Sequence, residues 1–194
     1  MPRLRAEQRK QQLIGVAVQV FARGGYSGTT TAEIARAAGV TEPILYRHFK
    51  NKAELFVAIV HSVSRSTVEH FEELIAGETD PIRRVRKVCA AIPDHIRRHA
   101  DEYHVLHGAL TTSRDRKVVE VIKEHYAAMH NFFRQLVKHG QDAGAFRTKM
   151  DAKKAAWHLV MTGVGYATLS LNLDIIDRAT ITETIDEVLR GMKQ

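Results

Sequence analysis

Cysteine and proline are scarce in this chain of 194 residues, which contains one cysteine and four prolines. The single thiol, Cys89, excludes an internal disulfide framework and any metal site built from several cysteines. The chain has no run of about 18 apolar residues, and its charged N-terminus is not followed by the apolar core of a signal peptide. We therefore expect a soluble cytoplasmic protein without a membrane partner, in a compartment that keeps thiols reduced.

Alternating strand patterns and catalytic motifs are missing as well. Apolar residues recur three and four positions apart over long stretches, which predicts an all-α fold of about nine helices. The sequence contains no GxSxG elbow and no glycine-rich phosphate loop. An enzyme stays an alternative only if residues distant in sequence form a catalytic site in the folded chain. Because no motif points to such a site, we expect no enzymatic activity and no cofactor.

The net positive charge is concentrated in the N-terminal third of the chain, where acidic residues are few. Residues 1–60 carry nine Lys or Arg against four Asp or Glu, a balance of +5 within the formal net charge of +7. A basic end on a nearly neutral body indicates a polyanionic partner at that end. The charge alone leaves DNA, RNA and anionic lipid open.

Helix start and stop signals divide the chain into nine segments. Thr30 stands three residues before Glu33, which is the spacing of a capping box. Asp80 and Pro81 are expected to begin a helix that Pro93 kinks or breaks. The predicted helices cover residues 5–22, 30–38, 41–49, 51–76, a segment from 81, 101–110, 115–141, 151–171 and 180–192.

Residues 31–49 have the layout of a helix-turn-helix. Small and apolar residues form the inner face of the first helix, Gly39 makes the turn, and Leu45 and Phe49 bury the second helix against the first. This assignment uses every apolar position of the segment. A polar surface turn of a helical bundle would leave the capping box, the glycine and the burial pattern as coincidences.

The outer face of the second helix carries side chains suited to DNA. The N-terminal residues of a recognition helix point at base edges in the major groove. Glu42 can accept from a cytosine amino group, whereas Pro43 and Ile44 can contact a thymine methyl group. The residues of this face are Thr41, Glu42, Pro43, Ile44, Tyr46, Arg47 and His48.

The stretch TTAEIARAAGVTEPILYRHFKNKAEL, residues 30–55, resembles the TetR family of bacterial transcriptional regulators. With GGYSGT ahead of it, the resemblance covers residues 16–56, and the later part is similar in architecture only. The resemblance implies a three-helix DNA-binding domain in residues 1–50. It also implies a larger helical domain in residues 51–194 that binds an effector and dimerises.

The resemblance also suggests which side chains contact DNA. The family's phosphate contacts fall on Thr30, Tyr46, His48 and Lys52, and its base contacts fall on Thr31, Thr41, Glu42, Pro43 and Ile44. Arg47, on the same outer face, completes the predicted DNA-binding set. Many relatives have a lysine and a glycine where this chain has Glu42 and Pro43, so an operator copied from those relatives is not expected here.

The segment 155–171 is apolar nearly all round and must be covered on several sides. A subunit interface and a central core helix of one subunit both fit this pattern. The resemblance favours the interface, because the last two long helices of the family form a four-helix contact between subunits. The predicted interface residues are Trp157, Val160, Gly163, Val164, Ala167, Ile181, Ile185, Val188 and Leu189.

The effector site is the part that the sequence constrains least. Residues suited to an apolar pocket are Phe71, Tyr103, His107, Tyr126, Met129, Phe133 and Met161, although this spacing is also typical of plain core. His95 and His99, four apart on one helix face, keep a metal-sensing repressor as an alternative. Because the lone Cys89 supplies no second soft ligand, we expect no metal site.

These patterns predict a homodimeric regulator that binds double-stranded DNA at a palindromic operator. The predicted regulator is a repressor, and binding of a small, largely apolar effector releases it from the operator. The sequence does not distinguish repression from activation. A nonspecific nucleoid-type DNA binder is the alternative, and its affinity would depend on salt but little on base sequence.

Overall fold

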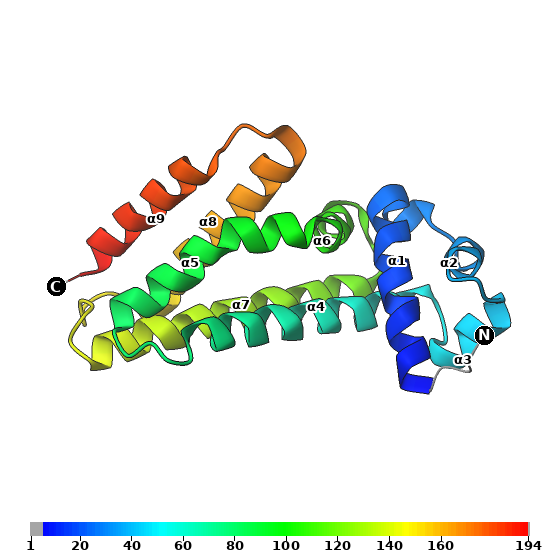
Figure 1. Cartoon of the computed structure of the whole chain (residues 1–194), viewed down its shortest axis with the longest axis horizontal. Coiled ribbons are helices and arrows are strands. Elements are labelled where there is room, and N and C mark those ends of the chain that lie inside the picture. The colour runs from blue at the N-terminus through cyan, green and yellow to red at the C-terminus, as the bar shows by residue number, and fades with distance from the viewer. Residues whose placement is uncertain (1–5, 194) are drawn as a thin grey trace. The chain divides into compact units, whose positions relative to one another are not determined.

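The computed structural model describes residues 6–193, and this part of the chain contains nine α-helices and no β-strand (Figure 1). The helices are α1 (Ala6–Gly28), α2 (Thr31–Ala37), α3 (Glu42–His48), α4 (Lys52–Ile75), α5 (Pro81–Arg98), α6 (Ala100–Thr112), α7 (Arg116–Asp142), α8 (Ala152–Leu173) and α9 (Arg178–Met192). The all-α prediction is confirmed. The predicted start of the first helix, at residue 5, lies outside the described residues. None of the nine helices is both long and apolar enough to cross a membrane.

The chain forms two compact units. The first unit comprises Met1–Val63 with Asp101–His125, and the second unit comprises Ser64–Ala100 with Tyr126–Gln194. Helices α4 and α7 each contribute residues to both units. The predicted boundary after residue 50 coincides with the start of α4, and a functional division at that point stays a prediction.

In the first unit, α2 and α3 form the predicted helix-turn-helix. Thr30 Oγ1 accepts from the backbone N–H of Glu33 at 3.2 Å, and Glu33 Oε2 accepts from the backbone N–H of Thr30 at 2.7 Å, so the capping box is confirmed. Gly39 makes the turn with a φ of 66°, which side chains disfavour. Leu45 and Phe49 are buried and hold α3 against α2.

Helix α1 is kinked near its C-terminal end. Gly25 has a φ of 66° and a ψ of 165°, and the helix continues beyond it to Gly28. The kink brings Tyr26 against Phe21 and Phe56, whose ring centroids lie 5.8 and 5.0 Å from that of Tyr26. This helix was predicted to end at residue 22, shortly before the kink, and its continuation beyond the kink adds Tyr26 to the core of the first unit.

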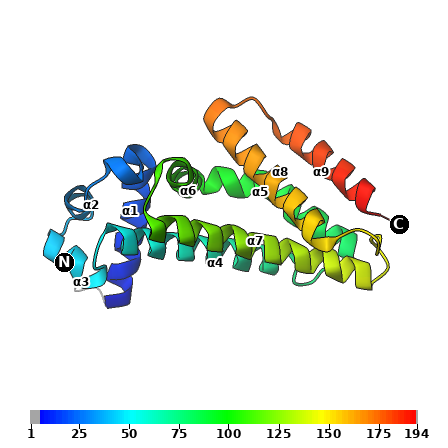
Figure 2. The ribbon, with the colours of Figure 1, turned by 180° about the vertical axis from the view of Figure 1, so that it is seen from behind.

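In the second unit, α8 and α9 lie side by side and both pack on α5 (Figures 1 and 2). Asp151 and Asp177 cap α8 and α9 by accepting from backbone N–H groups of the first turns. The inner part of the contact between the three helices is mainly apolar, and two ion pairs, Arg86 with Asp186 and Arg178 with Asp94, join α5 to α9. The residues that line the inner part are Cys89, Ile92, Leu159, Thr162, Gly163, Ile181, Ile185 and Val188.

Pro93 does not end α5, so the predicted break at this position is wrong. The helix runs over Pro81–Arg98 with Pro93 in its interior. A proline there removes one backbone donor and costs about 3 kcal/mol. Val88, Ile92 and Ile96 are buried on both sides of it, and burying each of them contributes about 1.5–3 kcal/mol. The apolar packing of both halves therefore outweighs the local cost of the proline.

Replacing Gly140 by alanine should destabilise the second unit. Phe146 is fully buried, and a Cβ at Gly140 would overlap its ring. Overpacking of this kind costs about 1–3 kcal/mol, and each kcal/mol corresponds to about 2–4 °C in the thermal midpoint of a chain of this size. Gly191→Ala is the matched control, because nothing lies within 4 Å of a Cβ at that position. Equal midpoints of Gly140→Ala and the wild type in a calorimetric scan would contradict the assigned packing.

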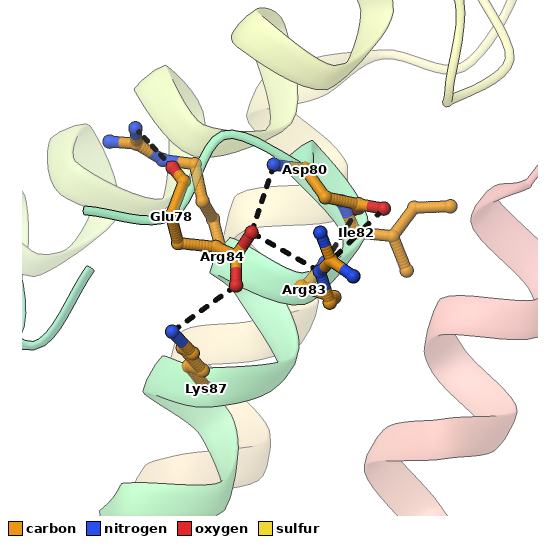
Figure 3. Close-up of polar contacts among 6 residues, drawn as sticks. All are labelled: Glu78, Asp80, Ile82, Arg83, Arg84 and Lys87. Atoms are coloured by element: carbon orange, nitrogen blue, oxygen red, sulfur yellow. Dashed lines mark hydrogen bonds and ion pairs between the residues drawn. The ribbon is translucent and has the colours of Figure 1, made fainter. Parts of the chain in front are cut away.

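One carboxylate, that of Glu78, closes the turn between α4 and α5 (Figure 3). Its Oε1 accepts from the backbone N–H of Asp80 and from Arg83 Nε, both at 3.1 Å, and Lys87 Nζ lies 3.2 Å from its Oε2. The hydrogen bond from the Asp80 backbone, followed by that from Lys87, lowers the pKa of Glu78 from 4.5 to about 2. The charged form of Glu78 therefore stabilises the fold.

Glu78→Gln should lower the thermal midpoint at neutral pH. Because the pKa of Glu78 is lower in the folded chain, its stabilisation is present above about 4.5 and is lost as the pH falls toward about 2. The difference in midpoint between wild type and Glu78→Gln should thus narrow as the pH falls through this window. Thermal scans at several pH values measure it, and a difference that stays constant down to the acid limit would disprove the assignment.

Candidate nucleic-acid interface

The predicted DNA-contacting residues gather at the start of α2 and on the outer side of α3. Leu45, on the opposite side of α3, is buried. The exposed members are Thr30, Thr41, Pro43, Tyr46 and Arg47, and the half-buried ones are Thr31, Glu42, Ile44, His48 and Lys52. The side chain of Thr41 makes no capping hydrogen bond to α3, so capping does not occupy its hydroxyl.

Hydrogen bonds join three of these side chains into one group. Thr31 Oγ1 donates to Glu42 Oε1 at 2.6 Å and lies 3.0 Å from the hydroxyl oxygen of Tyr46. Thr31 begins α2, whereas Glu42 and Tyr46 belong to α3. The contacts therefore fix the two helices of the motif to each other at their outer surface.

The hydroxyl of Thr30 is already engaged. It donates to Glu33 Oε2 at 2.8 Å in addition to accepting from the Glu33 backbone. The backbone and side-chain hydrogen bonds from Thr30 lower the pKa of Glu33, which keeps this carboxylate charged. The predicted phosphate contact of Thr30 must compete with this capping interaction.

Lys52 holds the turn between α1 and α2. Its Nζ donates to the backbone oxygens of Tyr26 at 2.8 Å and Thr29 at 2.9 Å, and it lies 4.6 Å from the centre of the Tyr26 ring. Two of its three N–H donors are thus used inside the protein. The contact of Lys52 with a DNA phosphate stays a prediction, and the third N–H group of the ammonium could make it.

Tyr26 extends this arrangement to the connection between α6 and α7. Its hydroxyl donates to Asp115 Oδ2 at 3.3 Å. Burial, together with the charge of Asp115, raises the pKa of Tyr26 to about 12, so the phenol stays a donor at physiological pH. This pair was not predicted, because no sequence pattern associates positions 89 residues apart.

The predicted effector residues are distributed over both units. Tyr103 and His107 belong to the first unit, where their ring centroids lie 6.1 Å apart. The members in the second unit are Phe71, Tyr126, Met129, Phe133 and Met161. Phe71 stacks on Phe132 in the core, whereas Met161 is 57% exposed on α8. A role in effector binding stays a prediction for all of them.

Three histidine rings lie close together in the second unit. The ring of His95 stacks on that of His70 at a centroid distance of 5.2 Å and is tilted against that of His99 at 4.5 Å. Burial, followed by the neighbouring His99 and His70, lowers the pKa of His95 to about 4, so this ring is neutral at physiological pH. Within residues 6–193 no group of three or more His, Cys, Asp or Glu side chains is arranged to hold a metal ion. The metal-sensing alternative gains no support from this cluster.

The predicted interface residues differ in their exposure. Trp157 is 42% exposed, and its ring stacks on that of His130 at 4.5 Å. The buried members are Val160, Ala167, Ile181, Ile185 and Leu189, and the half-buried members are Gly163, Val164 and Val188. The buried residues belong to the core of the second unit. A place at a subunit interface stays a prediction for the whole set.

Two buried hydroxyls on α8 were not singled out from the sequence. They belong to Tyr166, which is 2% exposed, and to Ser170, and neither finds a hydrogen-bond partner in the described part of the chain. Residues four apart lie on the same face of a helix. A buried hydroxyl without a partner costs roughly 1–3 kcal/mol. The only sign of these two hydroxyls in the sequence is that two hydroxyl-bearing residues stand four positions apart in an apolar segment.

Known proteins resemble the first part of the chain in sequence. Residues 13–59 match the family model described as bacterial regulatory proteins, tetR family. The chain is 33% identical over 104 residues to the HTH-type transcriptional activator FasR of Mycolicibacterium smegmatis, which covers 54% of this chain and 48% of FasR. It is 32% identical over 119 residues to the HTH-type transcriptional regulator AcrR of Shigella flexneri, which covers 60% of this chain and 49% of AcrR. The chain spans about half the length of these curated relatives.

The whole fold also has a counterpart among solved structures. The transcriptional regulator FadR of Bacillus subtilis, solved in complex with stearoyl-CoA, superposes with a TM-score of 0.77 at 21% identity. The match covers 92% of this chain and 96% of FadR. Both curated relatives are transcriptional regulators, in agreement with the prediction that the chain is not an enzyme.

Proposed function

We propose that this chain, whose residues 13–59 match the TetR family model, is a TetR-family regulator that binds a specific palindromic operator as a cytoplasmic homodimer. The outer side of α3 carries this proposal. Pro43, Tyr46 and Arg47 are exposed there, while Leu45 and Phe49 anchor the helix from behind. A short helix held in this way can enter the major groove with its polar side chains toward base edges.

The dimer supplies the second recognition helix. Two copies related by a two-fold axis read two half-sites about one helical turn apart, so the operator must be a palindrome. Exposed apolar residues on and after α8 support a partner surface there. They are Trp157, Met161, Leu173 and Ile175, which are 42%, 57%, 61% and 65% exposed.

Binding to the operator and to a scrambled duplex of equal length, measured at two salt concentrations, tests the proposal. We expect specific binding at least 1,000-fold tighter than nonspecific binding, in the range of about 10³–10⁷ found for specific DNA-binding proteins. Equal affinities that fall together with salt would instead identify a nonspecific binder.

The second unit is proposed to bind a small, largely apolar effector. The unpartnered hydroxyls of Tyr166 and Ser170 support an effector that carries a carbonyl oxygen, because a buried donor gains most from an acceptor delivered with an apolar molecule. In a long-chain acyl-CoA the thioester supplies such a carbonyl next to an apolar acyl chain, whereas the CoA part is charged and would lie outside the apolar site. Stearoyl-CoA is the first probe, because FadR of B. subtilis binds it. The effector is proposed to release a repressor through a lower affinity for the DNA-binding conformation.

Tyr166→Phe separates this effector role from a structural role. Removing a hydroxyl that lacks a partner should leave the thermal midpoint unchanged or raise it. The same variant should need a higher concentration of stearoyl-CoA for release from the operator. A clear loss of stability would mean that the hydroxyl is satisfied by water within the fold, and wild-type protein that stays on its operator with stearoyl-CoA would reject this ligand class.

A further inference from the structure

The direction of the hydrogen bonds in the Thr31–Glu42–Tyr46 group follows from counting protons. A charged carboxylate only accepts, so the 2.6 Å contact requires the single hydroxyl proton of Thr31 to point at Glu42. Thr31 Oγ1 then has only lone pairs for Tyr46, 3.0 Å away, and the phenol must be the donor. Donation therefore runs from Tyr46 to Thr31 and from Thr31 to Glu42.

This order determines what the group offers to DNA. The only donor of Tyr46 is used within the protein, so its outward side presents lone pairs, as does the remaining oxygen of Glu42. DNA phosphates are acceptors as well, so they form no hydrogen bond with a surface that presents only lone pairs. The phosphate contact that the resemblance implies for Tyr46 would require this chain of hydrogen bonds to open.

The donors that the major groove offers are the amino groups of cytosine and adenine. Cytosine presents its N4 amino group without an acceptor in the major groove, whereas adenine presents N6 beside the acceptor N7. A carboxylate beside N7 is repelled, so cytosine is the better partner. A glutamate that is held in place cannot turn away to avoid the wrong base.

We propose that Glu42 reads the N4 amino group of one cytosine in each operator half-site, and that Thr31 is the positioning residue that holds it there. The inference rests on the proposed function as an operator-binding regulator. The inference assigns an operator base to residue 42, where this chain has a glutamate and many relatives have a lysine.

The test compares duplexes selected from a random pool by the wild type and by variants of the group. We expect one cytosine per half-site, and replacing it should weaken wild-type binding by about tenfold. Glu42→Gln should shift the preference at that position to adenine, because glutamine pairs with both N6 and N7 of adenine. Glu7→Gln is the charge-matched control: Glu7 lies on α1, where its side chain bonds to Gln11, so its selected motif should be unchanged.

Variants of Thr31 and Tyr46 test the positioning role. Thr31→Val should broaden the preference at the cytosine position and lower the thermal midpoint only slightly, whereas Thr31→Ser, which keeps the hydroxyl, should retain the wild-type preference. Tyr46→Phe should keep the cytosine preference, because Thr31 can still donate to Glu42. A loss of the cytosine preference in Tyr46→Phe, as large as that in Thr31→Val, would overturn the assigned direction.

The possible outcomes distinguish the inference from its premise. An unchanged base preference in Glu42→Gln, with a clear palindrome for the wild type, would overturn the role of Glu42 and leave the operator-binding function intact. A wild-type selection without any motif would reject the proposed function and the inference together. A shift from cytosine to adenine in Glu42→Gln alone would support both.

Discussion

Replacing Lys52 by methionine should lower operator affinity by tenfold or more and lower the thermal midpoint as well. The ammonium group donates to two backbone oxygens, those of Tyr26 and Thr29, and methionine leaves both without this donor. Hydrogen bonds to a charged group contribute about 1.5–3 kcal/mol each. Because these bonds fix the turn that precedes α2, their loss should disturb the placement of the whole helix-turn-helix. Titration of labelled operator and a thermal scan measure the two effects.

Lys50→Met is the matched control for this prediction. It removes the same charge two residues earlier, but the Lys50 side chain is 86% exposed, and its ion pair with Glu54 spans 3.9 Å. Such an exposed pair contributes at most about 1 kcal/mol, so the thermal midpoint of Lys50→Met should stay close to that of the wild type. If both variants weaken binding equally and keep the wild-type midpoint, Lys52 acts only through its charge and does not hold the turn between α1 and α2.

Gly165→Leu should convert the proposed homodimer into monomers. A Cβ at Gly165 meets nothing within 4 Å in the chain, so a side chain at this position starts without a clash inside one subunit. If a second copy covers this face of α8, the added side chain is overpacked in both copies. At about 1–3 kcal/mol for each copy, the dissociation constant of the dimer should rise on the order of 100-fold or more. Sedimentation at micromolar concentration measures the change in mass.

The choice of glycine matters for this test. A Cβ at Gly163 would lie 3.8 Å from Ile92 Cδ1, so a leucine at Gly163 would disturb the packing of α8 on α5 inside one subunit. Gly15→Leu is the control, because Gly15 is also helical and open but lies on α1. A Gly165→Leu protein that sediments as a wild-type dimer would place the interface elsewhere.

The helix-turn-helix could be predicted because its determinants are local. Thr30 and Glu33 are three residues apart, Gly39 alone tolerates the positive φ of the turn, and Leu45 and Phe49 share one helix face. Each signal depends on neighbours within one or two helical turns. The helix bounds further along the chain follow from the same kind of pattern.

The features that were missed depend on residues distant in sequence. Thr31 and Glu42 are 11 positions apart, and Lys52 reaches a carbonyl 26 positions away. Burial around Pro93 outweighs its local tendency to break a helix, which only the packed structure reveals. The missing partner of the Tyr166 hydroxyl likewise depends on how other helices pack against the buried side of α8, which a single sequence does not specify.

Selection of bound duplexes from a random DNA pool at about physiological ionic strength tests the central claim most directly. Nonspecific phosphate contacts are partly suppressed under these conditions, so enrichment reports base readout. A sequence-specific homodimer should recover a palindrome whose half-sites are about one helical turn apart. Recovery of duplexes without any common motif would contradict the claim that α3 is a recognition helix.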